Sequence, residues 1–151
     1  MKPTDPVLLE GAEETEAFGS RLAPLLGIGD VLALSGDLGA GKTTLARGIL
    51  RALGFVGEVA SPTFPIVIPY DGLSVPVRHV DLYRIEEASE LDELGLDEAR
   101  EEAALLIEWP ERLGARLWVD SLLLNLERAG EGARALTARA PAAWGARWPP
   151  R

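Results

Sequence analysis

A glycine-rich segment at residues 36–43, with the sequence GDLGAGKT, determines the fold class that we expect for this chain. It matches the pattern G-x-x-x-x-G-K-[ST] at every fixed position. An apolar run at residues 31–34 precedes it and predicts a buried strand, and residues 44–53 follow it with apolar side chains at helical spacing. A strand, a glycine loop and a helix in this order are the context that a phosphate-binding P-loop requires.

The residue types of this loop predict how it would bind phosphate. Glycines let the backbone turn with positive φ, and loop N–H groups and the positive end of the following helix then point at phosphate oxygens. Lys42 should contact the β- and γ-phosphates, and the Thr43 hydroxyl should ligate Mg²⁺. The alternative interpretation is a strand-to-helix turn with an incidental lysine. The predicted nucleotide-binding residues of the loop are Gly36, Asp37, Leu38, Gly39, Ala40, Gly41, Lys42, Thr43 and Thr44.

Composition limits the kinds of chemistry that the chain can perform. Its 151 residues suffice for one domain with a core, and no apolar run approaches the roughly 18 residues of a membrane span. With no cysteine and one histidine, the chain has no thiol nucleophile, and a transition-metal site is disfavoured. Residues 1–14 contain no apolar signal-peptide region, so we expect a cytoplasmic protein. The net charge of −9 predicts that the chain binds neither DNA nor RNA unaided.

Apolar patterns and turn residues predict the remaining elements. Strands are expected at 7–9, 66–70, 75–81, 103–107, 117–126 and 134–138, and helices at 13–26 and, in two pieces interrupted near Gly95, at 86–102. The turn at Asp71-Gly72 predicts an antiparallel hairpin beside a parallel core. The expected fold is α/β: a single three-layer P-loop domain with a mixed sheet, mainly parallel at its core with antiparallel additions. We assign residues 1–140 to this domain and 141–151 to a poorly ordered tail.

Two acidic residues stand where buried strands are expected to end. A P-loop ATPase needs such an acid to hold Mg²⁺ or its water shell and to orient the attacking water. Glu108, after the apolar run 103–107, is the first candidate, and Asp81 is the second. Either carboxylate could instead leave its strand into solvent or cap the next segment. His79 shares a strand face with Asp81 and is either a catalytic base or a half-buried edge residue.

The loop at residues 60–65, ASPTFP, carries two hydroxyl groups near the expected γ-phosphate. We expect Ser61 and Thr63 to contact nucleotide in a switch-like loop, and a plain proline turn is the alternative. Trp109 is more typical of a core, a rim or a docking patch than of a ligand site. Residues 92–95, DELG, match the GTPase pattern D-x-x-G, but no apolar strand precedes them and no N-K-x-D motif is present. A guanine-specific GTPase is therefore disfavoured.

Four segments together resemble the TsaE (YjeE) family of bacterial ATPases, which take part in making threonylcarbamoyladenosine beside the tRNA anticodon. They are GDLGAGKTT at 36–44, SPTF at 61–64, HVDLYR at 79–84 and LIEWP at 106–110. The P-loop alone is generic, whereas the SPTF and HxDxYR motifs together are specific. The resemblance covers roughly residues 7–140, and the chain departs from the family at Ala60 and in its Pro- and Trp-rich end.

The resemblance implies a P-loop ATPase with weak intrinsic activity that uses ATP and Mg²⁺. It also implies work in complex with the TsaB–TsaD transferase assembly, with tRNA contacted only through those partners. By the matching motifs, Lys42 would be a catalytic residue on the phosphates. Thr43, Asp81 and Glu108 would form the Mg²⁺ and water site, with both acids taking part in catalysis.

Two more residues and two alternative functions complete the prediction. Thr15 and Arg134 match family positions near the nucleotide, so the resemblance adds them to the binding site. One alternative function is a small-molecule P-loop kinase, although no arginine-rich lid is visible between residues 71 and 102. The other is a regulator that binds nucleotide without hydrolysing it.

Overall fold

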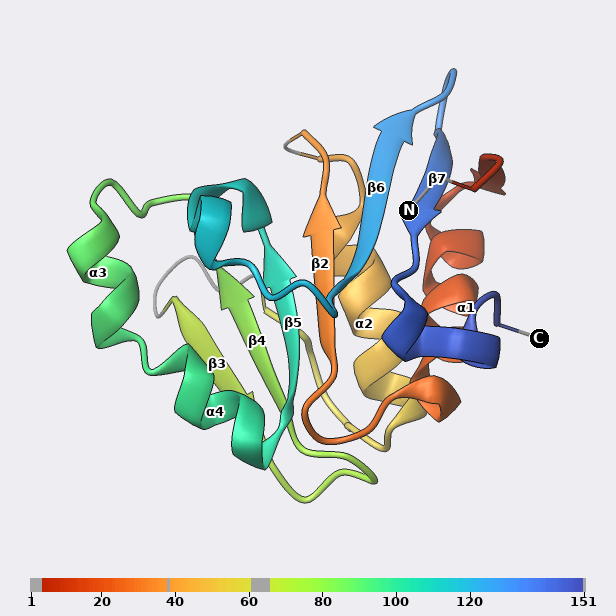
Figure 1. Ribbon diagram of the computed structural model, residues 1–151. Helices are drawn as coiled ribbons and strands as arrows, with labels where there is room; N and C mark the ends of the chain where they lie inside the picture. Colours follow the sequence, from red (N-terminus) through yellow and green to blue (C-terminus); the bar gives the residue numbers. More distant parts are fainter. Residues whose placement is uncertain (1–3, 38, 61–65, 151) are drawn as a thin grey trace.

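The computed structural model describes residues 4–37, 39–60 and 66–150, and these form one seven-stranded sheet with helices on both faces (Figure 1). The strands are β1 (Val7–Glu10), β2 (Val31–Ser35), β3 (Val67–Tyr70), β4 (Val77–Asp81), β5 (Ala104–Glu108), β6 (Leu122–Arg128) and β7 (Ala133–Arg139). The α-helices are α1 (Ala12–Leu22), α2 (Lys42–Ala52), α3 (Ala88–Glu93) and α4 (Leu96–Glu102). Three short 3₁₀ helices are η1 (Ala23–Leu25), η2 (Pro110–Arg116) and η3 (Ala142–Arg147).

The sheet is mixed, as the sequence predicts. Its strand order is β1-β7-β6-β2-β5-β4-β3, and the four inner strands β6, β2, β5 and β4 run parallel to one another. At one edge β3 pairs antiparallel with β4, and at the other β7 pairs antiparallel with β6 and with β1. The predicted hairpin at Asp71-Gly72 is therefore confirmed, and the P-loop strand β2 lies at the centre of the sheet.

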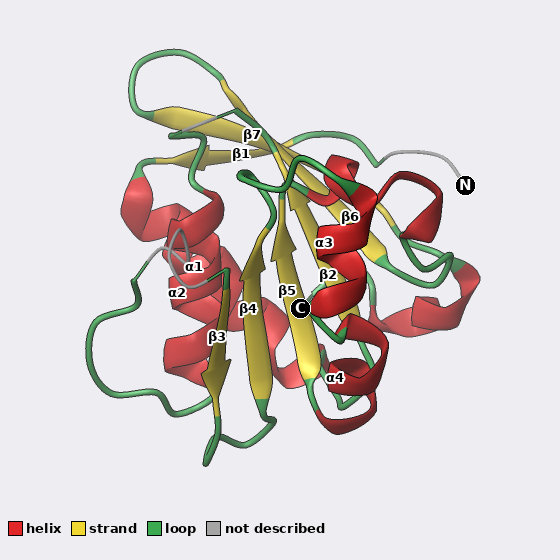
Figure 2. Cartoon of the chain, turned by 90° about the vertical axis from the view of Figure 1, so that its left-hand side faces the viewer, coloured by secondary structure: helices red, strands yellow, loops and turns green. Residues whose placement is uncertain are grey.

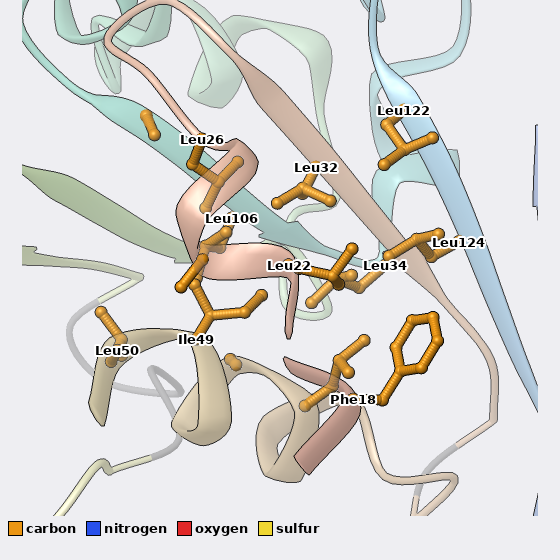
Figure 3. Packing of buried hydrophobic residues seen from close by; sticks show 14 of the residues in the cluster. Phe18, Leu22, Leu26, Leu32, Leu34, Ile49, Leu50, Leu106, Leu122 and Leu124 are labelled. Carbon is orange, nitrogen blue, oxygen red and sulfur yellow. The ribbon is translucent and has the colours of Figure 1, made fainter. Parts of the chain in front are cut away.

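Helices cover the two faces of the sheet and give the three-layer architecture (Figure 2). Side chains alternate between the faces along each strand. Leu32, Leu34 and Leu106 pack in the cluster that holds α1 and α2, shown in Figure 3, whereas Val31 and Ile107 pack in the cluster that holds α3, α4 and η2. Both faces of β2 and β5 are thus buried, which explains why their sequences are almost continuously apolar.

Helices α1 and α2 pack backbone against backbone through two glycines. A Cβ atom at Gly48 would overlap the carbonyl oxygen of Glu16, and one at Gly19 would overlap the carbonyl oxygen of Leu45. The Ser20 hydroxyl donates a hydrogen bond to the Gly48 carbonyl, 3.3 Å away. This contact holds α2, and with it the end of the P-loop, in one place against α1.

Two predicted elements differ more than the others from the observed bounds. The helix expected at 13–26 ends at Leu22, and a 3₁₀ turn that contains Pro24 follows, because proline cannot supply the N–H group that an α-helix needs. The strand expected from residue 117 begins only at Leu122, because Pro110 starts a 3₁₀ segment that includes a kink at Gly114.

The C-terminal segment differs from the poorly ordered tail that its composition predicts. Trp144 is 2% exposed and belongs to the core cluster beneath α1 and α2. The Arg147 guanidinium pairs with the Asp30 carboxylate at 2.6 Å, and the Trp148 ring meets the Phe18 ring edge-on at 6.2 Å. Proline and glycine suggested disorder here, but the two tryptophans offer a large apolar area that packing against α1 removes from water.

In the described part of the chain, no helix is both long enough and apolar enough to span a lipid bilayer.

Candidate nucleotide-binding site

The P-loop connects the carboxyl end of β2 to the first turn of α2. Gly39 and Gly41 adopt φ values of 77° and 103°, which lie in the left-handed region that favours glycine. A side chain at Gly36 would overlap the Leu126 carbonyl oxygen of β6, so only glycine fits there. The loop is therefore wound tightly above β2, with the N-terminus of α2 facing the space where phosphate is expected.

The two predicted acids lie side by side at the edge of the sheet that carries the P-loop. Asp81 ends β4, Glu108 ends β5, and the two residues are partners in the parallel register of these strands. Glu108 has the same strand parity as Leu106, so it faces the layer that contains α2. The structure therefore places the two acids next to each other at the ends of paired strands.

A cavity of about 300 Å³ opens where these elements meet. It brings together most of the residues predicted from the sequence, namely Thr15, Gly39, Gly41, Lys42, Thr43, Thr44, Asp81, Glu108 and Arg134. Three predicted residues, Gly36, Asp37 and Ala40, line a neighbouring hollow between the loop and β6 instead. The remaining three, Leu38, Ser61 and Thr63, lie outside the described residues.

Side-chain hydrogen bonds connect α2 to both acidic strands through Glu108. The Thr43 hydroxyl lies 3.1 Å from Oε2 and 3.3 Å from Oε1 of the Glu108 carboxylate. The His79 Nε2 atom, on β4, lies 2.6 Å from the same Oε2 atom. Glu108 is 3% exposed, so these donors compensate a carboxylate that water reaches very little.

Lys42 is a buried cation that points across the mouth of the loop. Its ammonium donates a hydrogen bond to the Gly36 carbonyl and lies 3.6 Å from the centroid of the Trp109 ring. Burial lowers the pKa of Lys42, while the nearby carboxylates, Glu108 first among them, oppose that shift. A phosphate in the cavity would add the opposite charge that a buried ammonium lacks.

Asp81 is also held in a fixed orientation. Its Oδ1 atom accepts a hydrogen bond from the Tyr83 backbone N–H at 2.9 Å. Burial raises the pKa of Asp81, and the neighbouring Glu108 carboxylate adds to the rise, while the Tyr83 N–H, Lys42 and His79 act against it. The site thus crowds two carboxylates together in a way that a cation would relieve.

Arg134 reaches the P-loop from β7. Its Nε atom donates to the Ala40 carbonyl at 2.9 Å, and Nη2 donates to the Gly39 carbonyl at 3.0 Å. Thr15, on α1, lines the same cavity, and its hydroxyl donates to the Gly11 carbonyl of its own helix. In the strand order, β7 lies on one side of β2 and the acidic strands β5 and β4 lie on the other. Arg134 and the two acids therefore approach the P-loop from opposite sides.

Three residues contribute in ways that the sequence analysis did not predict. Tyr83 and Trp109 line the cavity with ring centroids 5.0 Å apart, and Trp109 adopts a φ of 60°, which is rare for a residue other than glycine. Tyr83 and Trp109 each follow an acid closely in the sequence, and that proximity was the available signal.

The interpretation of His79 as a half-buried edge residue is wrong, because its side chain is fully buried.

The oxygen atoms of the site fit Mg²⁺ held together with a nucleotide. Thr43, Asp81 and Glu108 offer a hydroxyl and two carboxylates, which are the hard donors that Mg²⁺ prefers. Within the described ranges, no group of three or more His, Cys, Asp or Glu residues could hold a metal ion by itself. This donor set suits an ion that completes its coordination with phosphate oxygens and water.

Comparison with known proteins gives one consistent family. The family model described as threonylcarbamoyl adenosine biosynthesis protein TsaE matches residues 9–136. Two similar proteins are called tRNA threonylcarbamoyladenosine biosynthesis protein TsaE. The one from Bacillus subtilis is 41% identical over 126 residues, covering 83% of this chain and 78% of the relative. The one from Streptomyces coelicolor is 45% identical over 115 residues, covering 74% and 78%. The crystal structure of Bacillus subtilis YdiB superposes with a TM-score of 0.79 at 31% identity, covering 95% of this chain and 89% of that one.

Proposed function

This chain belongs to the TsaE family of threonylcarbamoyl adenosine biosynthesis proteins, and from that membership we propose that it binds and hydrolyses ATP in the modification of tRNA to threonylcarbamoyladenosine. The observation that supports this most is the arrangement of Lys42, Thr43, Asp81 and Glu108 around one cavity at the P-loop. A lysine, a hydroxyl and strand-end carboxylates at these places are the parts that a P-loop ATPase uses.

We assign the binding of ATP to the loop and to the start of α2. The N–H groups of residues 39–43 and the Lys42 ammonium would surround the β- and γ-phosphates. Thr43, Asp81 and Glu108 would hold Mg²⁺, which neutralises phosphate charge when it is bound. Thr15 and Arg134 would lie beside the rest of the nucleotide, because they line the opposite wall of the cavity.

Hydrolysis requires a water molecule in line with the γ-phosphorus. Its oxygen forms the new bond to phosphorus while the bond from phosphorus to the β–γ bridging oxygen breaks, and ADP and inorganic phosphate result. Glu108 would orient this water and accept its proton, because its carboxylate lies at the cavity wall beside Thr43. Asp81 would share the cation, and its orientation is already set by the Tyr83 N–H.

Partners complete the proposed function. We propose that the TsaB–TsaD complex raises a weak intrinsic ATPase activity and that tRNA is contacted through those proteins. The net charge of −9 supports this division of labour, because an acidic chain repels a polyanion. ATP hydrolysis would then reset the complex, whereas the modification of the base would be carried out by the partners.

The test is release of phosphate from ATP by the chain alone and then with purified TsaB, TsaD and tRNA. Glu108→Ala is the control for contaminating ATPases. We expect this variant to bind ATP with much of the original affinity and to lose about 100-fold or more in turnover.

Turnover that rises with the partners and disappears in the variant would support the proposal. ATP binding without hydrolysis under all these conditions would indicate a nucleotide-dependent regulator instead. Transfer of the γ-phosphate to a metabolite would indicate a kinase.

A further inference from the structure

We propose that His79 is a positioning residue that holds the Glu108 carboxylate in its working orientation; this rests on the proposed ATPase function. His79 lies on β4, two residues before Asp81, and its side chain is fully buried. Its Nε2 atom is 2.6 Å from the Glu108 Oε2 atom. His79 is the first residue of the HVDLYR segment, and it is not among the residues that line the cavity.

The surroundings of His79 determine which ring nitrogen donates a hydrogen bond to Glu108. A carboxylate only accepts hydrogen bonds, so the Nε2 atom of His79 must carry the hydrogen that Oε2 receives. The other ring nitrogen, Nδ1, is buried and has no hydrogen-bond partner among the described residues. The imidazole therefore makes one directed hydrogen bond, and that bond is to Glu108.

His79 and Thr43 donate to the same carboxylate but differ in their exposure to a ligand. Thr43 lines the cavity, and its oxygen is a predicted ligand of the cation, so its contact with Glu108 is shared with the nucleotide site. His79 is behind the cavity wall, where neither nucleotide nor cation reaches it. The His79 bond is thus the contact that can hold Glu108 in the same rotamer before, during and after turnover.

This role predicts an effect on hydrolysis rather than on binding. The loop backbone and Lys42 bind the phosphates, whereas Glu108 would act on the attacking water. A Glu side chain that loses a fixed rotamer spends less time in the reactive orientation. Loss of a hydrogen-bonded residue behind a catalytic or metal-binding group typically costs roughly 10- to 100-fold in activity.

Kinetics of two His79 variants test the role under the conditions in which the wild-type chain hydrolyses ATP. His79→Leu keeps an apolar side chain of similar bulk and removes the donor, so we expect kcat to fall roughly 10- to 100-fold with KM for ATP within about threefold. In His79→Gln the amide nitrogen can occupy the place of Nε2, so we expect most of the kcat to return. Unchanged kcat in His79→Leu, or no recovery in His79→Gln at equal melting temperature, would overturn the proposal.

A second measurement needs no turnover, because the chain has a single histidine. In the nucleotide-free protein, ¹⁵N-labelled imidazole signals should show hydrogen on Nε2, with a downfield, slowly exchanging Nε2–H proton. Glu108→Gln replaces a charged acceptor with a neutral one and should move this proton upfield. An Nε2 atom without hydrogen, or a signal that does not respond to Glu108→Gln, would contradict the contact. If the wild-type chain never hydrolyses ATP, the proposed function fails while this spectrum still decides whether His79 holds Glu108.

Discussion

At the scale of single residues, the site contains buried charged side chains that neighbouring side chains neutralise only in part. Lys42 is 4% exposed, and its ammonium contacts a carbonyl oxygen and an aromatic face, without an ion pair to a carboxylate of the described residues. Asp81 and Glu108 stand beside each other on paired strands. Such an arrangement is costly in an empty site and favourable when phosphate and a cation arrive together.

Removal of the buried Lys42 ammonium should therefore weaken nucleotide binding. We expect Lys42→Ala to raise the Kd for ATP by roughly 30-fold, equivalent to about 2 kcal/mol for a charged hydrogen bond, and to abolish turnover. Titration with a fluorescent ATP analogue measures the change. Arg51, on the same helix as Lys42, makes a partly exposed ion pair with Glu16 of α1, so Arg51→Ala is the matched control and should bind ATP normally. Equal affinity of Lys42→Ala and the wild type would refute the phosphate assignment.

The raised pKa of Asp81 predicts how stability depends on pH. The native state keeps the Asp81 proton to higher pH than the unfolded chain does, chiefly because of burial. Stability therefore falls as pH rises from the ordinary pKa of Asp through the raised one, and it stays lower above that window.

Asp81→Asn removes this penalty and retains the acceptor for the Tyr83 N–H. Without nucleotide and metal, we expect it to melt at a higher temperature than the wild type at neutral pH, and at nearly the same temperature below about pH 4. Asp71→Asn, at an aspartate whose side chain is 69% exposed, is the control and should show a smaller difference. A variant that melts at a lower temperature at neutral pH would show that the Asp81 charge is stabilising.

At the scale of elements, the P-loop is supported by a hairpin far away in sequence. Strand β7 supplies Arg134, whose guanidinium donates to the Ala40 and Gly39 carbonyls of the loop. The Leu126 carbonyl oxygen of β6 lies so close to Gly36 that a side chain there would overlap it. The loop is thus held on one side by α2 and on the other by the β6–β7 hairpin.

Arg134→Ala should loosen the loop without removing any P-loop residue. The loss of its hydrogen bonds to the loop, worth about 1 kcal/mol net, should weaken ATP binding by roughly fivefold. Arg139→Ala, at the exposed far end of β7, is the matched control. Isothermal titration with a non-hydrolysable ATP analogue distinguishes the two variants, and equal Kd values for them would argue against a supporting role of Arg134.

Much of the fold and site could be predicted from the sequence because short patterns encode them directly. Alternation, apolar runs and turn residues located the described strands approximately, and strand-end position, together with the acid that a P-loop ATPase needs, identified Asp81 and Glu108. What could not be predicted depends on contacts between distant segments. The burial of His79, the stacking of Trp109 over Lys42 and the Arg134 bonds each join elements that only the folded sheet brings together. Local pattern holds no information about such distances.

At the scale of the whole molecule, the C-terminal segment closes the end of the core opposite to the nucleotide cavity. Arg147 pairs with Asp30, which lies just before β2, whereas the P-loop follows the other end of that strand. Trp144 fills the core, and Trp148 packs against Phe18 of α1. The segment therefore contributes to stability without contacting the proposed chemistry.

Trp144→Ala tests this separation of stability from binding. We expect the free energy of unfolding to fall by about 3–5 kcal/mol, as is usual when a buried aromatic residue is truncated, while ATP affinity stays unchanged below the melting temperature. Urea denaturation gives the first quantity and nucleotide titration the second. Val56→Ala, at a valine that is 92% exposed, is the control and should change neither. A stable Trp144→Ala variant would mean that the segment is not part of the core.

The pairing of the first strand with the last has a consequence for how the protein comes into being on the ribosome. Strand β1 pairs only with β7 in the described sheet, and the walls of the cavity run from Gly11 to Arg134. The P-loop strand β2 likewise pairs with β5 and β6, which are synthesised long after it. Such distant pairings assemble late, because their chain segments must be closed into large loops first. The nascent chain therefore exposes its glycine loop well before the cavity is complete, because the cavity cannot form until Arg134 has been synthesised.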